Sequence, residues 1–368
     1  MRTTSTPGVI ASAHASPATS LGPHQERSMC SPGMPDNTGA QKGGSPQAGG
    51  LFSSTPRRAA AGKSARGTGE GAQREHCRDL RARLFAPMNA SLDPLRARLL
   101  DLGPRVAEGA AQVAKDRREL AVLFPQLPRT MSKAQLGGGI ANVGGSRCDL
   151  DGWRKCDAAA ALLLAESKAT DAELLDLYAH GDLEERAMLL RSLAALPITA
   201  ATGALLLEVQ RTNMVLHLEA ACCDSDLLVR VKKAGLPNFG KPEQNRLLLK
   251  VAFLDLPLSR VFDSASLANE ELSRMLQDLA TEREAAGRPV WRDTDRLLAR
   301  APVPGTVARI LGGIEHGDDQ RRLAAAEALA LLQRSDLAAF AKERMPREPR
   351  PEIRAALQRA TTTKHATN

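Results

Sequence analysis

From Trp153 onward, leucine and alanine recur at three- and four-residue steps, and glycine or proline interrupts the pattern at short intervals. This spacing places apolar side chains on one face of a helix, and each interruption gives the helix a stop. No segment shows sustained alternation of period two, the pattern of a half-buried strand. The sequence therefore predicts an all-α fold, with helices over residues 153–167, 171–180, 183–196, 200–210, 213–223, 226–234, 243–254, 267–286, 291–299, 304–315, 319–334 and 350–361.

An internal repeat indicates how these helices are organised. His-Gly-Asp begins at His180 and again at His316, and in both copies an arginine follows, Arg186 or Arg322, before a Leu/Ala face. The segment from Asp226 to Arg230 is a looser third copy. Short capped helices with Ala/Leu faces bury those faces only by stacking, so the sequence predicts HEAT-like stacked helix pairs, an α-solenoid-like architecture.

The N-terminal part of the chain has a different composition. Its first 75 residues are rich in Gly, Ser, Pro and Ala and have few large apolar side chains, which predicts a disordered tail. The predicted organisation is a disordered low-complexity tail, an N-terminal helix pair, a Gly-rich loop, a helical-repeat domain and a C-terminal helix with its tail, over residues 1–75, 76–124, 125–151, 152–345 and 346–368.

Charge gives a weak indication of function. The chain has 50 Lys and Arg against 42 Asp and Glu, but residues 1–75 hold 8 of the former and 4 of the latter, so half of the excess lies in the tail. In the rest of the chain the two signs are interspersed, as on a solvated surface. Nucleic-acid binding by the folded part is therefore not expected, although weak binding through the basic tail remains a third hypothesis.

The sequence offers no catalytic or metal-binding constellation. None of the six cysteines forms a C-x-x-C pair, and the adjacent Cys222 and Cys223 are interpreted as small residues of a buried helix. His180 ends a predicted helix, and His217 is the one histidine in the interior of a predicted helix, where a hydrogen-bonded core role is expected. There is no H-x-x-x-H, no G-x-S-x-G and no phosphate-binding loop. We therefore expect no cofactor and no metal.

No membrane span is expected either. The least polar segment, residues 187–209, contains Arg191, Pro197 and Gly203, and its uncharged run is shorter than the roughly 20 residues that a span needs. The first 25 residues lack the apolar core of a secretory signal. A cytoplasmic protein is the expectation.

Five stretches resemble one known family. They are residues 149–153 (Asp-Leu-Asp-Gly-Trp), 184–197 (a helix that ends in Leu-Pro), 211–213 (Arg-Thr-Asn), 245–253 (Asn-Arg-Leu-Leu-Leu-Lys-Val-Ala-Phe) and 268–289 (from Ala-Asn-Glu-Glu-Leu to Gly-Arg-Pro). Together they resemble the EboA-like proteins of bacteria over about 123–332. The resemblance implies a place in a small gene cluster for the processing or export of secondary-metabolite precursors, with protein partners from that cluster.

This chain departs from the family pattern at several places. The family has Tyr-x-His before a Glu-Arg pair and Trp just after it, whereas this chain has Leu279, Thr281 and Glu284 there. A family loop of Asn-Pro-Tyr type is replaced around Cys222–Asp224. These differences indicate a divergent member.

The polar residues of the resembling stretches are the candidate binding positions. They are Arg211, Asn213, Asn245, Lys250, Asn269, Arg274, Glu282 and Arg283. Such residues often cap a neighbouring helix or join adjacent repeats, and this structural interpretation competes with a partner or ligand surface. In particular, we expect Glu282 and Arg283 to join their helix to the helix of residues 245–253, with Asn245 meeting a helix end.

Three functions remain open from the sequence. The first is a non-enzymatic helical scaffold or accessory protein that binds partners of a metabolite-processing assembly. The second is an enzyme, or an enzyme subunit, that uses the Asn/Arg/Glu set on a small anionic substrate. The third is the weak nucleic-acid binder described above.

Overall fold

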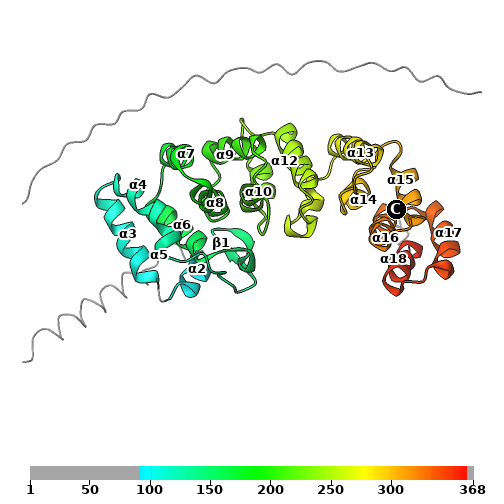
Figure 1. Ribbon diagram of the computed structural model, residues 1–368, viewed down its shortest axis with the longest axis horizontal. Helices are drawn as coiled ribbons and strands as arrows, with labels where there is room; N and C mark the ends of the chain where they lie inside the picture. The colour runs from blue at the N-terminus through cyan, green and yellow to red at the C-terminus, as the bar shows by residue number, and fades with distance from the viewer. Residues whose placement is uncertain (1–91, 101, 363–368) are drawn as a thin grey trace, which may run out of the picture. The chain divides into compact units, whose positions relative to one another are not determined.

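The computed structural model describes residues 92–100 and 102–362, and within them the all-α prediction is confirmed (Figure 1). The predicted disordered tail and residues 76–91 of the predicted helix pair lie outside these ranges. The α-helices are α2 (Asp93–Arg98), α3 (Gly103–Lys115), α4 (Glu119–Leu123), α5 (Leu127–Thr130), α6 (Lys155–Glu166), α7 (Asp171–His180), α8 (Leu183–Ser192), α9 (Ala200–Arg211), α10 (Val215–Cys222), α11 (Leu227–Ala234), α12 (Lys241–Phe253), α13 (Glu270–Ala285), α14 (Thr294–Leu298), α15 (Thr306–Ile314), α16 (Asp319–Leu332), α17 (Ser335–Arg344) and α18 (Pro351–Thr361).

The central helices pack in two rows. One row is α6, α8 and α10, and the other is α7, α9, α12 and α13, with contacts between successive members of each row. Figure 1 shows α7 and α9 lying above α8 and α10. Each helix of these rows therefore packs on helices close to it in the sequence.

Helix α6 is the most enclosed element. Nine consecutive residues, from Cys156 to Leu164, are buried, so the helix has no solvent-facing stripe. It packs on α2, α3, α5 and α8. A helix that is apolar all round belongs in the interior, which accounts for the run of Ala and Leu in its sequence.

The segment predicted as a Gly-rich loop contains a β-hairpin. Strand β1 (Ile140–Val143) pairs antiparallel with β2 (Ser146–Asp149), and Val143 lies opposite Ser146. The two residues between them, Gly144 and Gly145, have φ of +60° and +78°. Two-residue hairpin turns of the favoured twist need positive φ at both central positions, which glycine adopts without strain. The expected absence of strands is corrected here: four-residue strands are too short to show a clear alternation.

The C-terminal helices have a core of their own. The first apolar cluster runs through the chain as far as Leu298, and a second one begins at Ala299 and includes Ile310, Leu329 and Leu357. Helix α17 was not predicted, because α16 stops at Gln333, whose φ is +49°, and a new helix starts two residues later. Helices α16, α17 and α18 pack together, whereas the sequence-based division separates α18 from the repeat domain.

The arginines of the internal repeat share one structural role. Arg186 donates hydrogen bonds to the carbonyls of Tyr178 and Ala179, at 2.9 and 3.1 Å, where α7 ends. Arg322 reaches the carbonyls of His316 and Gly317, which follow α15, at 3.0 and 2.9 Å.

Arg230, in the third copy, reaches the carbonyls of Ala194 and Leu196 at 2.6 and 3.2 Å, beyond the end of α8. The last carbonyls of a helix have no partner within it and attract positive charge. In each copy, an arginine of one helix thus caps the end of an earlier one.

Candidate functional site

Asn245 and Asn269 pair with each other inside the protein. The amide of Asn245 donates to Oδ1 of Asn269 at 3.2 Å, and the amide of Asn269 donates to Oδ1 of Asn245 at 2.8 Å. Asn269 is also the N-cap of α13, since its Oδ1 accepts the backbone N–H of Leu272. Asn245 is fully buried. It therefore meets a helix end, as the sequence analysis expected.

Lys250 and Arg283 use their charges on the ends of neighbouring helices. The Lys250 ammonium donates to the carbonyl of Gln210, at the end of α9, over 2.9 Å. Arg283 donates to the carbonyl of Phe253, the last residue of α12, over 2.6 Å, and its guanidinium lies over the Phe253 ring. Both ties repeat the capping seen in the internal repeat.

The other four candidates lie on the surface. Arg211 pairs with Glu208 and Arg274 with Glu270, each within its own helix. Asn213 and Glu282 are exposed, and neither side chain has a hydrogen bond or ion pair among the described residues. The expected tie through Glu282 is therefore wrong: its side chain makes no hydrogen bond or ion pair with α12 in the described part, while the next residue along the helix, Arg283, makes the tie. The eight positions are not gathered into one cavity.

We expect Asn245→Ala to lower the free energy of unfolding by about 1–3 kcal/mol, because it removes a buried amide and both of its hydrogen bonds with Asn269, whose amide nitrogen keeps only the carbonyl of Leu267. Asn269→Ala should cost a similar amount plus the loss of a helix cap. The double variant should cost less than the sum, since both changes remove the same pair. Urea unfolding measures all three, and Glu282→Ala, which removes no described contact, is the matched control. Additive costs, or an equal cost for the control, would contradict the pairing.

One edge of the helical rows combines motif residues with exposed apolar side chains. We call it the motif edge and define it by Leu183, Arg211, Asn213, Met214, Val215 and Phe253. Two contacts connect the helices that carry these residues: the His217 ring, two residues after Val215, bonds to the carbonyl of Leu183 at 2.9 Å, and Lys250, three residues before Phe253, bonds to the carbonyl of Gln210, next to Arg211. The four apolar members are between 38% and 50% exposed, and they are half of the large apolar side chains that the described part exposes.

A second polar cluster was missed by the sequence analysis. Asp224 is buried, and its carboxylate accepts from Arg191 at 2.9 Å and from Arg260 at 2.9 and 2.7 Å. Arg260 also pairs with Glu219. Backbone hydrogen bonds also hold Asp224 in place: its N–H donates to the carbonyl of Arg260, and the N–H of Asp149 donates to the carbonyl of Asp224. The cluster joins α8, α10, the hairpin and the segment after α12, in the region where the chain departs from the family loop.

Electrostatics favour the ionised form of Asp224. Burial by itself would raise the pKa of this carboxyl, but the hydrogen bonds and charges of Arg260 and Arg191 outweigh it and lower the pKa. Gly152 lies against the carboxylate, and a Cβ there would overlap it. Position 152 therefore needs a residue without a side chain. This packing constraint explains the glycine of the Asp-Gly-Trp stretch.

The described residues contain no group of three or more His, Cys, Asp or Glu side chains placed to bind a metal. Cys148, Cys156, Cys222 and Cys223 are buried, and burial raises the pKa of the Cys148 and Cys223 thiols to about 12. Such thiols are poor nucleophiles. His217 is buried, with one ring nitrogen bonded to Leu183 and the other without a partner in the described part. None of the described helices is long and apolar enough to cross a membrane.

These features define an all-α protein in which four of the eight polar motif residues join neighbouring helices and four lie on the surface. Comparison with known families identifies its family. Residues 107–299, just over half of the chain, match the family described as metabolite traffic protein EboA. The chain belongs to the EboA family. Neither the comparison with curated proteins nor the comparison with solved structures found a match.

Proposed function

We propose that this protein is a non-catalytic accessory protein of metabolite traffic, which holds a protein partner on the motif edge. The observation that carries the proposal is the coincidence of exposed apolar side chains with the family-like residues Arg211 and Asn213. Exposed apolar side chains that cluster, rather than scatter singly, mark interaction surfaces. HEAT-like stacking of the helices and a cytoplasmic location are part of this proposal.

The partner we propose is a protein encoded in the same gene cluster that presents an apolar helix with acidic side chains at its border. Phe253 would be the central anchor, since it is half exposed and already supports the guanidinium of Arg283. Aromatic and arginine side chains dominate the energetics of protein interfaces. Arg211 stands beside the apolar residues with most of its side chain in solvent, where it can meet a carboxylate of the partner.

The alternative of an enzyme that acts on a small anion through the Asn/Arg/Glu set has less support. Asn245 and Asn269 use their amides on each other, and Lys250 and Arg283 use their charges on backbone carbonyls. A substrate would have to break these bonds before it could use the groups. Partner binding needs no such rearrangement, because the motif edge is exposed as it stands.

Site-specific photo-crosslinking tests the proposal. A photoreactive residue in place of Asn213 should trap a neighbouring gene product when the two are produced together, since this side chain is exposed and makes no described contact. The control places the same residue at Ile140, which is 67% exposed and lies on the hairpin. Trapping of the same product at both positions, or at neither, would count against the motif edge.

A further inference from the structure

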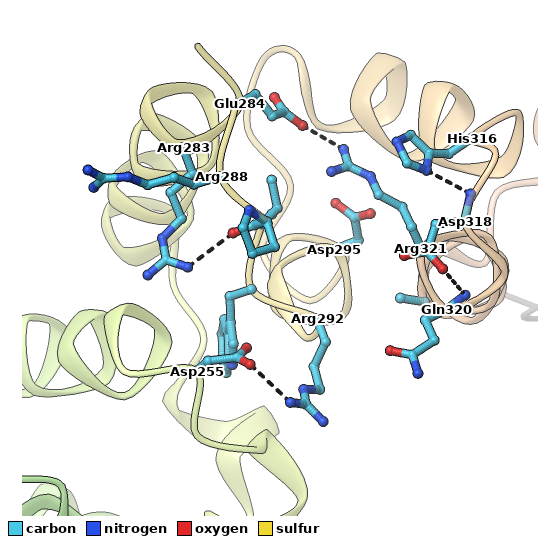
Figure 2. A pocket seen from close by; sticks show the side chains of 14 residues that line it. Asp255, Arg283, Glu284, Arg288, Arg292, Asp295, His316, Asp318, Gln320 and Arg321 are labelled. Carbon is cyan, nitrogen blue, oxygen red and sulfur yellow. Dashed lines mark hydrogen bonds and ion pairs between the residues drawn. The ribbon is translucent and has the colours of Figure 1, made fainter. Parts of the chain in front are cut away.

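A pocket of about 450 Å³ lies among α13, α14 and α16. Its walls come from the end of α13 with the segment after it, from α14, and from the start of α16 (Figure 2). Ligand pockets in proteins fall in the range of about 300–1,000 Å³. The family-matched region ends at residue 299. The pocket is therefore lined partly by that region and partly by the C-terminal helices.

Most charges that line this pocket are already paired. Glu284, which replaces the tryptophan of the family pattern, accepts from Arg309 at 3.1 and 2.9 Å and from Arg321 at 2.7 Å. Arg292 pairs with Asp255 at 3.0 Å. The wall thus holds both signs, mostly in pairs, with Arg288 as a cation that has no described ion pair, and a ligand with a large net charge of either sign would meet like charges beside its partners.

Two buried polar atoms on the wall, Oδ1 of Asp295 and Nε of Arg321, have no hydrogen-bond partner among the described residues. Asp295 is 5% exposed, its carboxylate makes no hydrogen bond, and its nearest cation is Nε of Arg309 at 3.6 Å. Nε of Arg321 also has no acceptor. Figure 2 shows the Asp295 carboxylate directed toward the Arg321 side chain as that side chain runs from α16 to Glu284. A buried polar group without a partner costs about 1–3 kcal/mol, so a ligand that supplies partners gains affinity.

The two groups require opposite partners. Asp295 needs a donor and Arg321 needs an acceptor, and a hydroxyl group is both. Gln320 lines the same wall with an amide that makes no side-chain bond among the described residues. His316 accepts the N–H of Asp318 on Nδ1 at 3.1 Å, so its proton is on Nε2, a further donor.

Small anions and small cations both fit this pocket less well than a neutral molecule with hydroxyl groups. The start of α16 would attract an anion, but Asp318 already caps this helix and Glu284 and Asp295 lie opposite. A cation would meet Arg321 and, behind it, Arg309. We therefore propose that the pocket binds a small neutral molecule with several hydroxyl groups, a polyol or a sugar, with Asp295, Gln320 and Arg321 as its hydrogen-bonding residues.

Calorimetric titration of the full chain tests this site with four probes: sorbitol, glucose, glucose 6-phosphate and putrescine. Saturable binding of at least one neutral probe, tighter than binding of the phosphate or the diamine, is the expected result. Tighter binding of a charged probe, or no saturable binding of either neutral probe, would overturn the proposal.

Variants locate the bound molecule. Asp295→Asn should weaken neutral-probe binding about tenfold, since a charged acceptor is replaced by a weaker one. Gln320→Ala provides a second variant at an exposed position, where loss of the fold is not expected, and it should weaken binding severalfold. Glu343→Gln, in an exposed pair of α17 that does not line the pocket, is the control and should leave affinity within about twofold. Wild-type affinity in Gln320→Ala together with wild-type affinity in a folded Asp295→Asn would overturn the assignment, and so would equal losses in the control.

Discussion

Asp224→Asn is expected to lower the free energy of unfolding by about 3–5 kcal/mol, the cost of breaking a buried ion pair by removing one partner. The side chains of Asp224 and Arg191 are 5% and 7% exposed, so neither charge can turn to water when the other is lost. Arg260 is more exposed and could recover part of its solvation. Urea unfolding at neutral pH measures the effect. The control is Glu270→Gln, which breaks an exposed pair of α13 and should change stability by less than about 1 kcal/mol.

The stability loss in Asp224→Asn is also expected to depend on pH. Because the folded-state pKa of Asp224 is lowered, its ionised form contributes stability that is fully present above the unfolded pKa of about 3.9. This contribution disappears as the pH falls through the lower, folded-state pKa. The difference between the wild type and Asp224→Asn should therefore be largest at neutral pH and should shrink below about pH 4. A difference that stays constant down to pH 3 would show that the loss is one of packing rather than of charge.

The sequence predicted most of the helices because their determinants are local. The capping box at Asp182 is one example: its carboxylate accepts the N–H groups of Glu184 and Glu185, as Gly-Asp before a Leu/Ala run indicates. The hairpin was missed because Gly144 and Gly145 fit a flexible loop and a tight turn equally well. Helix α17 was missed because the left-handed Gln333 that separates it from α16 leaves no mark in the sequence.

The candidate site was harder to predict, because side-chain direction depends on tertiary packing. Glu282 and Arg283 are neighbours in one motif, yet in the described part only Arg283 bonds to α12. Asp224, Arg191 and Arg260 are more than thirty residues apart from one another, so no local sequence pattern shows that they meet. A usable signal did exist for this cluster, since the family loop is replaced at Asp224. The same applies to Glu284, which stands where the family has tryptophan and joins two arginines of the C-terminal helices.

The central claim is that this EboA-family protein acts by holding a partner on the motif edge, and Phe253→Ser tests it most directly. The measurement is the affinity of the purified protein for the gene product that photo-crosslinking identifies. Loss of a half-exposed aromatic anchor should weaken binding by at least tenfold, the effect of removing an interface hot spot. Circular dichroism should confirm that the variant keeps its fold.

Ile140→Ser removes a side chain that is even more exposed, but it lies on the hairpin and is not one of the motif-edge residues. We predict that this control keeps the wild-type affinity, while Phe253→Ser loses most of it. Equal affinity in the two variants, with both folded, would contradict the account.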